Sequence, residues 1–355
     1  MTFRWQHCIT AALLAAGLGA CSGTTSQAPL PAAPADAAAL RAQGVAVSNK
    51  PFANRPEHFQ FAVVGDRTGG HRPGVFARAM GQLNLLQPEF VLSVGDHIEG
   101  YSDDKDAIAA RWRDVQSHID TLQLPYFYVP GNHDISNPVM LAAWRAQLGR
   151  DYYHFRYRDV LFLVLSTEDP PTASNKKRLM EELGVSADEY RQAVKTLQGE
   201  PAQVAAAVAA NPRLATIAAA LAGGDSATLS DAQVSYMSDA LAANADVRWT
   251  FVLMHKPAWK YDAPGFARIE AQLQSRPYTV LAGHFHYYSR EQRFGRDYIQ
   301  MGTTGGTQRT HPPGPGTLDH LMWVTMGADG PHIANIALDG LFDRSGPQQV
   351  RQPAP

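Results

Sequence analysis

Apolar runs alternate with amphipathic segments over residues 59–131 of the chain. The runs at 59–65 (FQFAVVG), 89–95 (EFVLSVG) and 126–131 (YFYVPG) have the length of strands, and each ends in glycine. The two segments between them place apolar residues at helical spacing, and prolines stand near the start and at the close of the first segment. This strand–helix–strand–helix–strand order predicts a layered α/β fold whose neighbouring strands run largely parallel.

The second half of the chain continues this pattern after an interruption. Residues 152–167 hold two β runs that meet at Arg158–Asp159, which predicts a hairpin. Residues 169–228 are rich in alanine and lack a β pattern, so we expect a helical insertion there. Further strands are predicted at 249–255 (WTFVLMH) and 278–283 (YTVLAG), and the C-terminal third is rich in strand patterns.

The N-terminus predicts a targeting segment instead of a folded element. Residues 9–20 are apolar, but this run is shorter than the roughly 20 residues that a bilayer span needs, and it fits a secretory signal. The sequence LGAC, which ends at Cys21, resembles the lipobox of bacterial lipoproteins, whose cysteine becomes the lipidated first residue of the mature chain. We therefore expect a lipoprotein signal peptide at 1–20, a flexible Ala/Pro-rich tether at 21–51 and a folded domain at 52–345.

A lipid anchor on Cys21 implies a place in the bacterial cell envelope, facing the periplasm. Ser22 directly after the cysteine favours the outer membrane over the inner one. Cys8 is the one other cysteine, so cleavage leaves no thiol for a disulfide or a soft-metal site. The alternative is an ordinary signal peptide in which Cys21 is incidental. A net charge of −2 gives no basic field of the kind that nucleic-acid binding requires.

Carboxylate, amide and imidazole side chains follow five of the apolar runs. They are Asp66, Asp96, Asn132, His255, His284 and His286. Because α/β sheets bind ligands outside the carboxyl ends of their strands, we expect these side chains to converge. The last two stand two residues apart, so in a strand both would point the same way. Oxygen and nitrogen donors without thiolate suit Mn, Fe or Zn, and this set is too large for a single tetrahedral ion.

Taken in chain order, the motifs GD (65–66), GDxxE (95–99), GNHD (131–134), His255 and GHxH (283–286) resemble the calcineurin-like metallophosphoesterase family. The resemblance covers about residues 58 to 340 apart from the insertion. It implies a four-layer α-β-β-α sandwich of two mixed sheets, the metallo-dependent phosphatase type. It also implies hydrolysis of phosphoester bonds by two divalent or trivalent ions, with a metal-bridging hydroxide as the nucleophile.

The resemblance also implies a role for each candidate side chain. Asp96 would bridge both ions. Asn132, His255 and His284 would complete the site of one ion, and Asp66 and His286 would belong to the site of the other. His133 would protonate the leaving oxygen, and Asp134 would either orient His133 or cap a helix.

One position departs from the family pattern. The first motif usually reads D-x-H, but its third position here is Thr68, so one ion lacks an imidazole. Glu99 stands three residues after Asp96, where purple acid phosphatases place a tyrosine ligand, and we expect it to fill the vacancy; the alternative is a solvated loop glutamate. Arg67 would either grip phosphate oxygens of the substrate or form a structural salt bridge.

The predicted activity is therefore a phosphatase or phosphodiesterase acting on a phosphorylated small molecule or lipid. The alternative is a non-catalytic, envelope-binding lipoprotein on a degenerate metallophosphoesterase fold. Thr68 is the main support for that alternative, whereas His133, which a pure binder does not need, argues against it. Metal-dependent hydrolysis of another bond, such as an amide, is disfavoured by the order of the motifs.

Overall fold

The computed structural model describes residues 37–42, 46, 48, 50, 55–171, 176–197, 201–224, 226–308 and 316–341. The chain divides into two compact units, Met1–Arg55 and Pro56–Pro355. In the first unit the structure describes one short helix, α1 (Ala37–Ala42), while the expected signal peptide and Cys21 lie outside the described residues. Among the described helices, none combines the length and the apolar character that crossing a bilayer requires.

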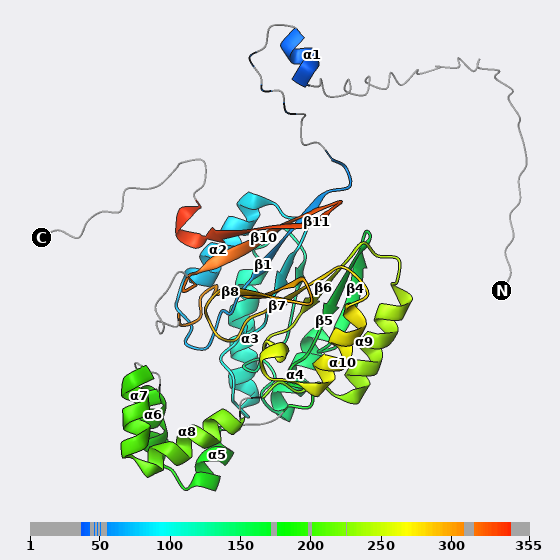
Figure 1. The fold of residues 1–355 in the computed structure, drawn as a ribbon. Coiled ribbons are helices and arrows are strands. Elements are labelled where there is room, and N and C mark those ends of the chain that lie inside the picture. The colour runs from blue at the N-terminus through cyan, green and yellow to red at the C-terminus, as the bar shows by residue number, and fades with distance from the viewer. Residues whose placement is uncertain are drawn as a thin grey trace, which may run out of the picture. The chain divides into compact units, whose positions relative to one another are not determined.

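The second unit contains two mixed β-sheets (Figure 1). In spatial order, the strands of the first sheet are β11 (Gly330–Ala337), β10 (His320–Gly327), β1 (Phe59–Val64), β2 (Val91–Ser93) and β3 (Tyr126–Phe127). β1, β2 and β3 run parallel, as the apolar pattern predicts, and β10 joins the other edge of β1 in antiparallel orientation.

The second sheet places parallel strands at its centre and antiparallel strands at both edges. In spatial order, its strands are β4 (Tyr153–Tyr157), β5 (Val160–Val164), β6 (Trp249–Leu253), β7 (Tyr278–Ala282), β9 (Arg296–Gln300) and β8 (Ser289–Arg293). β5, β6, β7 and β9 are parallel, and β4 pairs with β5 through the predicted hairpin at Arg158–Asp159. Arg158 takes a positive φ of 52°, which lets the chain reverse there.

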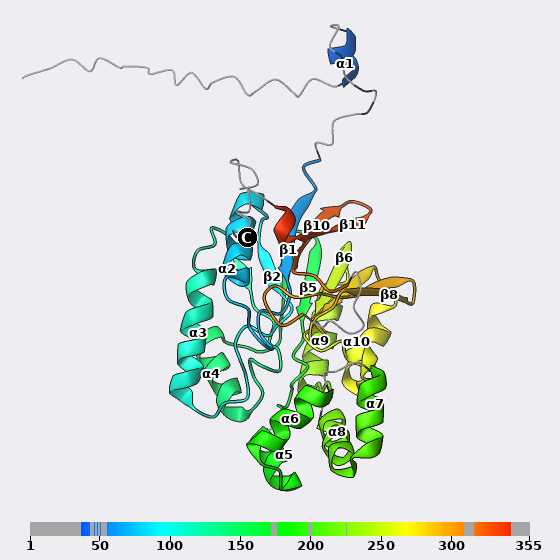
Figure 2. The ribbon, with the colours of Figure 1, turned by 90° about the vertical axis from the view of Figure 1, so that its left-hand side faces the viewer.

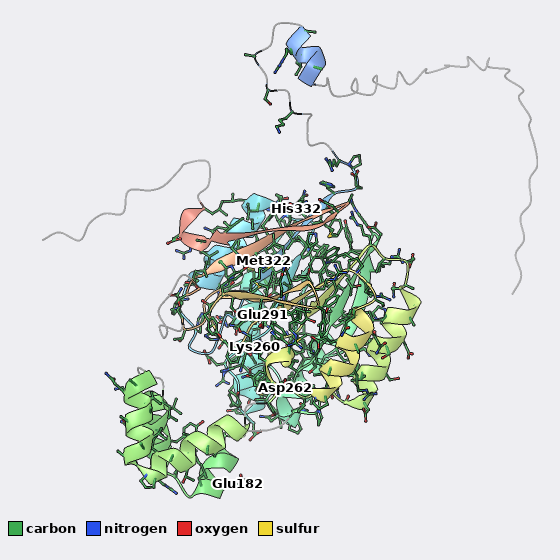
Figure 3. The ribbon with its side chains drawn as sticks, in the orientation of Figure 1. Glu182, Lys260, Asp262, Glu291, Met322 and His332 are labelled. Atoms are coloured by element: carbon green, nitrogen blue, oxygen red, sulfur yellow. The ribbon has the colours of Figure 1, made fainter. Side chains whose placement is uncertain are left out.

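The two sheets pack face to face around one apolar core. Alternate side chains of β1, β2 and β10 meet alternate side chains of β5, β6, β7 and β9 there, and Met322 of β10 is one of them (Figure 3). The Phe61 ring lies edge-on to Phe162 and Phe251, with ring centroids 5.3 and 5.1 Å apart. The opposite side chains of β2, β5, β6 and β7 are also buried, so each sheet needs a second covering layer.

Helices supply both outer layers. The first sheet is covered by α2 (Val75–Leu86), α3 (Lys105–Ile119) and α4 (Pro138–Leu148), and the second by α9 (Asp231–Ala243) and α10 (Pro264–Leu273). Figure 2 shows these two groups of helices on opposite sides of the sheets. Short 3-10 turns, η1 (Ala258–Lys260) and η2 (Leu338–Gly340), complete the body. The predicted four-layer α-β-β-α architecture is thereby confirmed.

Four helices fall within residues 169–228. They are α5 (Lys176–Leu183), α6 (Ala187–Leu197), α7 (Pro201–Ala210) and α8 (Pro212–Gly224), and they share a small apolar core of their own. The two ends of this segment meet, because Thr228 exchanges backbone hydrogen bonds with Thr167 (2.9 Å) and Asp169 (3.1 Å). A buried ion pair between Lys256 and Glu168 (2.6 Å) lies at the same junction.

His320, the first residue of β10, is fully buried in this fold. Its Nε2 accepts the Gly302 backbone N–H at 3.0 Å, and its Nδ1 lies 3.0 Å from Asn335 Oδ1, so a neutral ring satisfies both partners. Burial lowers the pKa of His320 to about 4, although the hydrogen bond to Asn335 opposes this shift.

We expect His320→Gln to remove part of the acid sensitivity of folding. The folded pKa lies below the ordinary value of 6.5, so the unfolded chain binds this proton more readily, and stability is lost as the pH falls from 6.5 towards 4. At pH 4.5 this loss amounts to about 2 to 3 kcal/mol. Urea unfolding of both metal-free proteins at pH 7 and pH 4.5 measures the difference, and equal losses in variant and wild type would contradict the assignment.

Candidate metal centre

The candidate ligands lie in loops that leave the carboxyl ends of parallel strands in both sheets. Asp66 follows β1, Asp96 follows β2, and His255 follows β6. Each offers a side-chain oxygen or nitrogen, these three atoms all lie within 4.8 Å of one another, and all three residues are buried. The predicted convergence of residues from different strands is therefore present.

Three other candidate side chains lie close to the Nε2 atom of His255. It lies 3.2 Å from Asp96 Oδ2, 3.0 Å from Asn132 Oδ1 and 3.3 Å from His284 Nδ1. The family resemblance implies that Asp96 is the bridging carboxylate and that the other three side chains hold one ion. Several lone-pair atoms this close together need a proton or a cation among them.

Asp66 and His286 form the other half of the cluster. His286 Nε2 lies 3.2 Å from Asp66 Oδ2, which also accepts the His284 backbone N–H at 2.9 Å. The second oxygen, Oδ1, is buried and makes no hydrogen bond to any residue that the structure describes. A buried carboxylate oxygen without a partner is costly, and a bound cation would satisfy it. The donor set and this oxygen therefore fit a metal centre.

Backbone carbonyls fix the tautomers of two candidate imidazoles. His255 Nδ1 lies 2.8 Å from the carbonyl oxygen of Val94, and His286 Nδ1 faces the carbonyl oxygen of Thr307. A carbonyl only accepts, so each Nδ1 carries the hydrogen when the ring is neutral. Each Nε2 then keeps its lone pair and points at a carboxylate of the cluster, which is the arrangement that a metal ligand needs.

The electrostatics of the cluster favour a positive charge. Burial alone would lower the pKa of His255, but the nearby carboxylates of Asp96 and Asp66 outweigh it and raise that pKa well above its ordinary value. Burial would likewise raise the pKa of Asp96, and the His255 and His133 rings overcome it and hold the pKa below its ordinary range. Two buried carboxylates thus stabilise whatever cation lies between them, whether a proton or a metal ion.

His133 occupies the rim of the cluster. Its backbone N–H donates to Asp96 Oδ1 at 2.9 Å, and its Nδ1 accepts the Gly100 backbone N–H at 3.1 Å. Because Nδ1 is an acceptor, the neutral ring carries its hydrogen on Nε2. This tautomer presents a donor to a neighbouring oxygen, as the expected role of His133 requires.

Asp134 has neither of the two roles considered from the sequence. Its carboxylate accepts backbone N–H groups from Asp96 (2.9 Å), His97 (2.8 Å), Ile98 (3.2 Å) and Gly131 (2.9 Å). It also lies 3.0 Å from His97 Nδ1. This fully buried side chain therefore fastens the loop after β2 to the loop after β3, instead of orienting His133 or capping a helix.

The structure places Glu99 and Arg67 away from the Asp66–Asp96–His255 group. Glu99 Oε1 accepts the backbone N–H groups of Gly70 (3.1 Å) and His71 (2.9 Å), and 41% of its side chain is exposed. Its other oxygen lies 3.6 Å from His133 Nδ1.

Arg67 is buried, and its guanidinium donates to the His97 carbonyl oxygen at 2.9 Å and pairs with Asp114 of α3. This contact corresponds to the salt-bridge alternative for Arg67. Both residues support the walls of the site in the described geometry.

His284 and His286 are directed toward the cluster by a bend in the chain and not by the alternation of side chains along a strand. Both lie past the end of β7, in a bend, and both have positive φ angles, 76° and 57°. Gly283 precedes them and leaves no room for a side chain, because a Cβ there would collide with the Asp66 carboxylate. The expectation that a strand aims both rings is therefore wrong, since loop geometry aims them.

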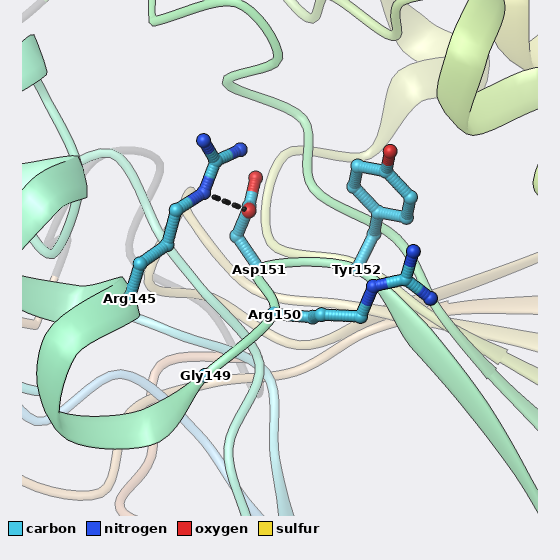
Figure 4. A pocket seen from close by; sticks show the side chains of 5 residues that line it. All are labelled: Arg145, Gly149, Arg150, Asp151 and Tyr152. Carbon is cyan, nitrogen blue, oxygen red and sulfur yellow. Dashed lines mark hydrogen bonds and ion pairs between the residues drawn. The ribbon is translucent and has the colours of Figure 1, made fainter.

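Aromatic residues near His284 line one flank of the cluster. Tyr261 stacks on Phe285 with centroids 6.0 Å apart, and Lys260, labelled in Figure 3, holds its ammonium 5.7 Å from the Phe285 ring. A separate cavity of about 320 Å³ lies near the start of β4, lined by Arg145, Gly149, Arg150, Asp151 and Tyr152 (Figure 4). None of the candidate ligands lines that cavity.

Tyr101 is a functional candidate that the sequence interpretation missed. Its hydroxyl oxygen accepts the Asn132 Nδ2–H at 2.7 Å, and its ring packs edge-on against His133. A lone tyrosine in a glycine-containing loop, five residues after Asp96, carries no motif of its own. Only its contacts mark it.

Comparisons with known proteins match the chain to one family and one fold. The family model described as calcineurin-like phosphoesterase matches residues 59–288. Among solved structures, PhoD is similar with a TM-score of 0.50 at 12% identity, over 80% of this chain and 69% of PhoD. The comparison with curated proteins gave no match.

Two further solved structures are similar at lower scores. A dimetal phosphatase from Danio rerio has a TM-score of 0.46 at 15% identity, over 79% of this chain and 99% of that one. The purple acid phosphatase PPD1 from yellow lupin (Lupinus luteus) seeds has a TM-score of 0.48 at 13% identity, over 82% of this chain and 53% of that one. Since the family model matches more than half of its residues, this chain belongs to the calcineurin-like phosphoesterase family.

Proposed function

We propose that the protein hydrolyses phosphoester bonds with two metal ions held at the Asp66–Asp96–His255 cluster. The observation that carries this proposal is the convergence of buried carboxylate and imidazole groups from both sheets within 4.8 Å. Family membership supports phosphoester chemistry, and the solvent-facing rim with His133 supplies a proton donor for it.

The residues divide into two overlapping sets of ligands. Asp96 would be shared, with Asn132, His255 and His284 on one ion and Asp66 and His286 on the other. Oxygen and nitrogen donors of this kind suit Mn, Fe or Zn. When bound, such ions lower the pKa of water so that a hydroxide is present at neutral pH, and they stabilise the attacking and leaving oxygens together.

The chain's own residues perform the remaining steps. Because Nδ1 of His133 accepts the Gly100 N–H, the ring presents its Nε2–H to the leaving oxygen and would help to stabilise and protonate it. The buried Asp134 keeps the backbone of Asp96 and Gly131 fixed while charge develops on the substrate. The substrate is a phosphorylated small molecule or a phosphorylated lipid.

The departure at Thr68 favours one specific alternative. Thr68 is fully buried where the family pattern has an imidazole, and Glu99 is hydrogen-bonded to a loop. A non-catalytic metallophosphoesterase fold that binds at the envelope would be consistent with a weakened second ion site. Metal stoichiometry separates the two, because catalysis by this mechanism requires two ions per chain.

We also propose that the protein is attached to the bacterial cell envelope through a lipid on Cys21. The support is the sequence LGAC after a short apolar run, followed by an Ala/Pro-rich segment that provides reach. Attachment facing the periplasm, with the outer membrane favoured over the inner one, would place the metal centre among envelope phosphoesters.

We expect Asp96→Asn to weaken metal binding at least about 100-fold and to abolish hydrolysis, because it removes the shared anionic ligand. Metal analysis of purified protein and hydrolysis of 4-nitrophenyl phosphate and bis(4-nitrophenyl) phosphate measure both effects. Asp246→Asn, which changes a surface carboxylate paired with Arg156, is the matched control and should behave as wild type. Equal metal content in the Asp96 variant and the wild type would refute the proposed centre.

We expect His133→Asn to slow hydrolysis by about 10²- to 10⁴-fold for an alkyl phosphoester and by much less for a 4-nitrophenyl ester. A nitrophenolate leaves without protonation, whereas an alkoxide does not, and the metal content should stay unchanged. His332→Asn on β11 is the control, since the exposed His332 (labelled in Figure 3) pairs with Thr325, which pairs with Gln60 at the amino end of β1, whereas Asp66 follows the carboxyl end of that strand. An equal loss for both substrates would show that His133 is not the acid.

We expect Cys21→Ser to release the protein from membranes. Without the thiol no lipid can be attached, so the variant should move from the detergent phase to the aqueous phase in a Triton X-114 partition of whole-cell lysate. Cys8→Ser is the control, because Cys8 lies within the segment expected to be removed. A variant that still partitions with detergent would rule out the anchor.

A further inference from the structure

The loop after β2 lies along the loop after β3, and hydrogen bonds connect the two at successive residues. The Gly100 N–H donates to His133 Nδ1 at 3.1 Å, and the Tyr101 N–H donates to Ser136 Oγ at 3.0 Å. One residue further on, the Ser102 carbonyl oxygen accepts from Asn137 at 3.0 Å. Tyr101 is therefore held at its backbone beside the two residues, Asn132 and His133, that the proposed function needs.

Tyr101 takes an uncommon backbone conformation in this loop. Its φ is 61°, in the left-handed region that residues with a side chain seldom adopt, and 40% of the residue is exposed. The Tyr101 side chain is therefore only partly buried, and burial of its ring alone does not account for the unusual backbone conformation. Strained residues of this kind concentrate at functional sites, where the surrounding contacts hold them in place.

The hydroxyl of Tyr101 contacts the nitrogen end of the Asn132 amide, and the oxygen end faces the cluster. Asn132 Nδ2 donates to this hydroxyl at 2.7 Å, and Oδ1 consequently lies 3.0 Å from His255 Nε2. An amide has an oxygen at one end and two N–H donors at the other, and only the oxygen can bind a cation. Without the hydroxyl, Nδ2 would lose this partner and the amide would be held less firmly, and a flipped amide would present N–H groups to the ion.

The ring of Tyr101 contacts the second functional residue. Its centroid lies 5.1 Å from that of His133, and the planes meet at 76°, which is a favoured edge-to-face geometry for aromatic pairs. The Gly100 N–H fixes the imidazole at Nδ1, and the tyrosine ring limits its rotation. One side chain therefore supports the ligand and the proton donor from opposite ends, with its hydroxyl on Asn132 and its ring on His133.

We propose that Tyr101 is a positioning residue of the metal centre, whose hydroxyl orients the Asn132 amide as an oxygen ligand and whose ring holds His133 in place. This inference rests on the proposed function. If it is correct, loss of the tyrosine hydroxyl weakens metal binding through Asn132. A residue that served only in packing would not have this effect.

The test uses Tyr101→Phe, which removes the hydroxyl and keeps the ring. Titration of the metal-free protein with Mn²⁺, followed by calorimetry, should show one of two ions bound about 10- to 100-fold more weakly, with the other unchanged. The thermal unfolding temperature of the metal-free variant should match that of the wild type. Tyr236→Phe is the matched control, because it removes a hydroxyl bonded to His154 (2.9 Å), which is not a candidate ligand.

A second background separates orientation from general damage. In Asn132→Asp both ends of the side chain are oxygen, so no orientation has to be set, and adding Tyr101→Phe should leave Mn²⁺ affinity within about twofold of that single variant. Tyr101→Leu, which also removes the ring, should in addition slow hydrolysis of alkyl esters more than of 4-nitrophenyl esters at saturating metal.

Three results would overturn the inference. The first is a Tyr101→Phe variant that binds both ions as the wild type does, and the second is an equal loss of affinity in the Asn132→Asp background. In both cases a wild type that binds two ions and hydrolyses phosphoesters leaves the proposed function intact. The third is a wild type that binds neither ion, which would overturn the proposed function and this inference together.

Discussion

The carboxylate of Asp134 is the interaction on which the site depends most. It is fully buried and forms no ion pair with any lysine or arginine among the described residues; instead, it accepts four backbone N–H groups and lies 3.0 Å from His97 Nδ1. Such bonds to a charged acceptor are stronger than those between neutral groups. They join two loops that end different strands, and together with the His133 N–H bond to Asp96 they hold Asp96 and Asn132 at a fixed spacing.

Close packing around the ligands adds a second constraint. A Cβ at Gly131 would collide with the Asp96 carboxylate, and a Cβ at Gly95 would lie 2.8 Å from His255 Nδ1. Gly95 also has a φ of 98°, which only glycine adopts readily. Gly95 and Gly131, which close two of the predicted strands, are therefore needed because the loops approach the ligands at contact distance.

The sequence predicts the scaffold well, because strand length and helical spacing depend on local patterns that burial enforces. It also predicts that Asp66, Asp96 and His255 converge, since the carboxyl ends of parallel strands share an edge. It does not predict the directions of side chains in the loops. Asp96 and His284 have φ angles of 60° and 76°, and no alternation rule applies in that region.

Contacts within the loops escape the sequence for the same reason. Tyr101 meets Asn132, and Glu99 meets the backbone of Gly70 and His71, through hydrogen bonds that depend on the tertiary path of each loop. The spacing of Glu99 from Asp96 equals that of a ligand tyrosine in a related family, but spacing does not determine the direction of a loop side chain. The role of Asp134 was likewise hidden, because its partners are backbone groups that any sequence would supply.

The meeting of Thr167 and Asp169 with Thr228 has an evolutionary consequence. The residues just before and just after the segment that holds α5–α8 are joined by hydrogen bonds. For the rest of the fold, this segment therefore replaces a tight turn between neighbouring residues. An insertion, deletion or exchange at this junction can therefore lengthen, shorten or replace the helical segment without moving β5 or β6. The phosphoesterase body offers an attachment point where new recognition modules can be acquired while its chemistry is inherited unchanged.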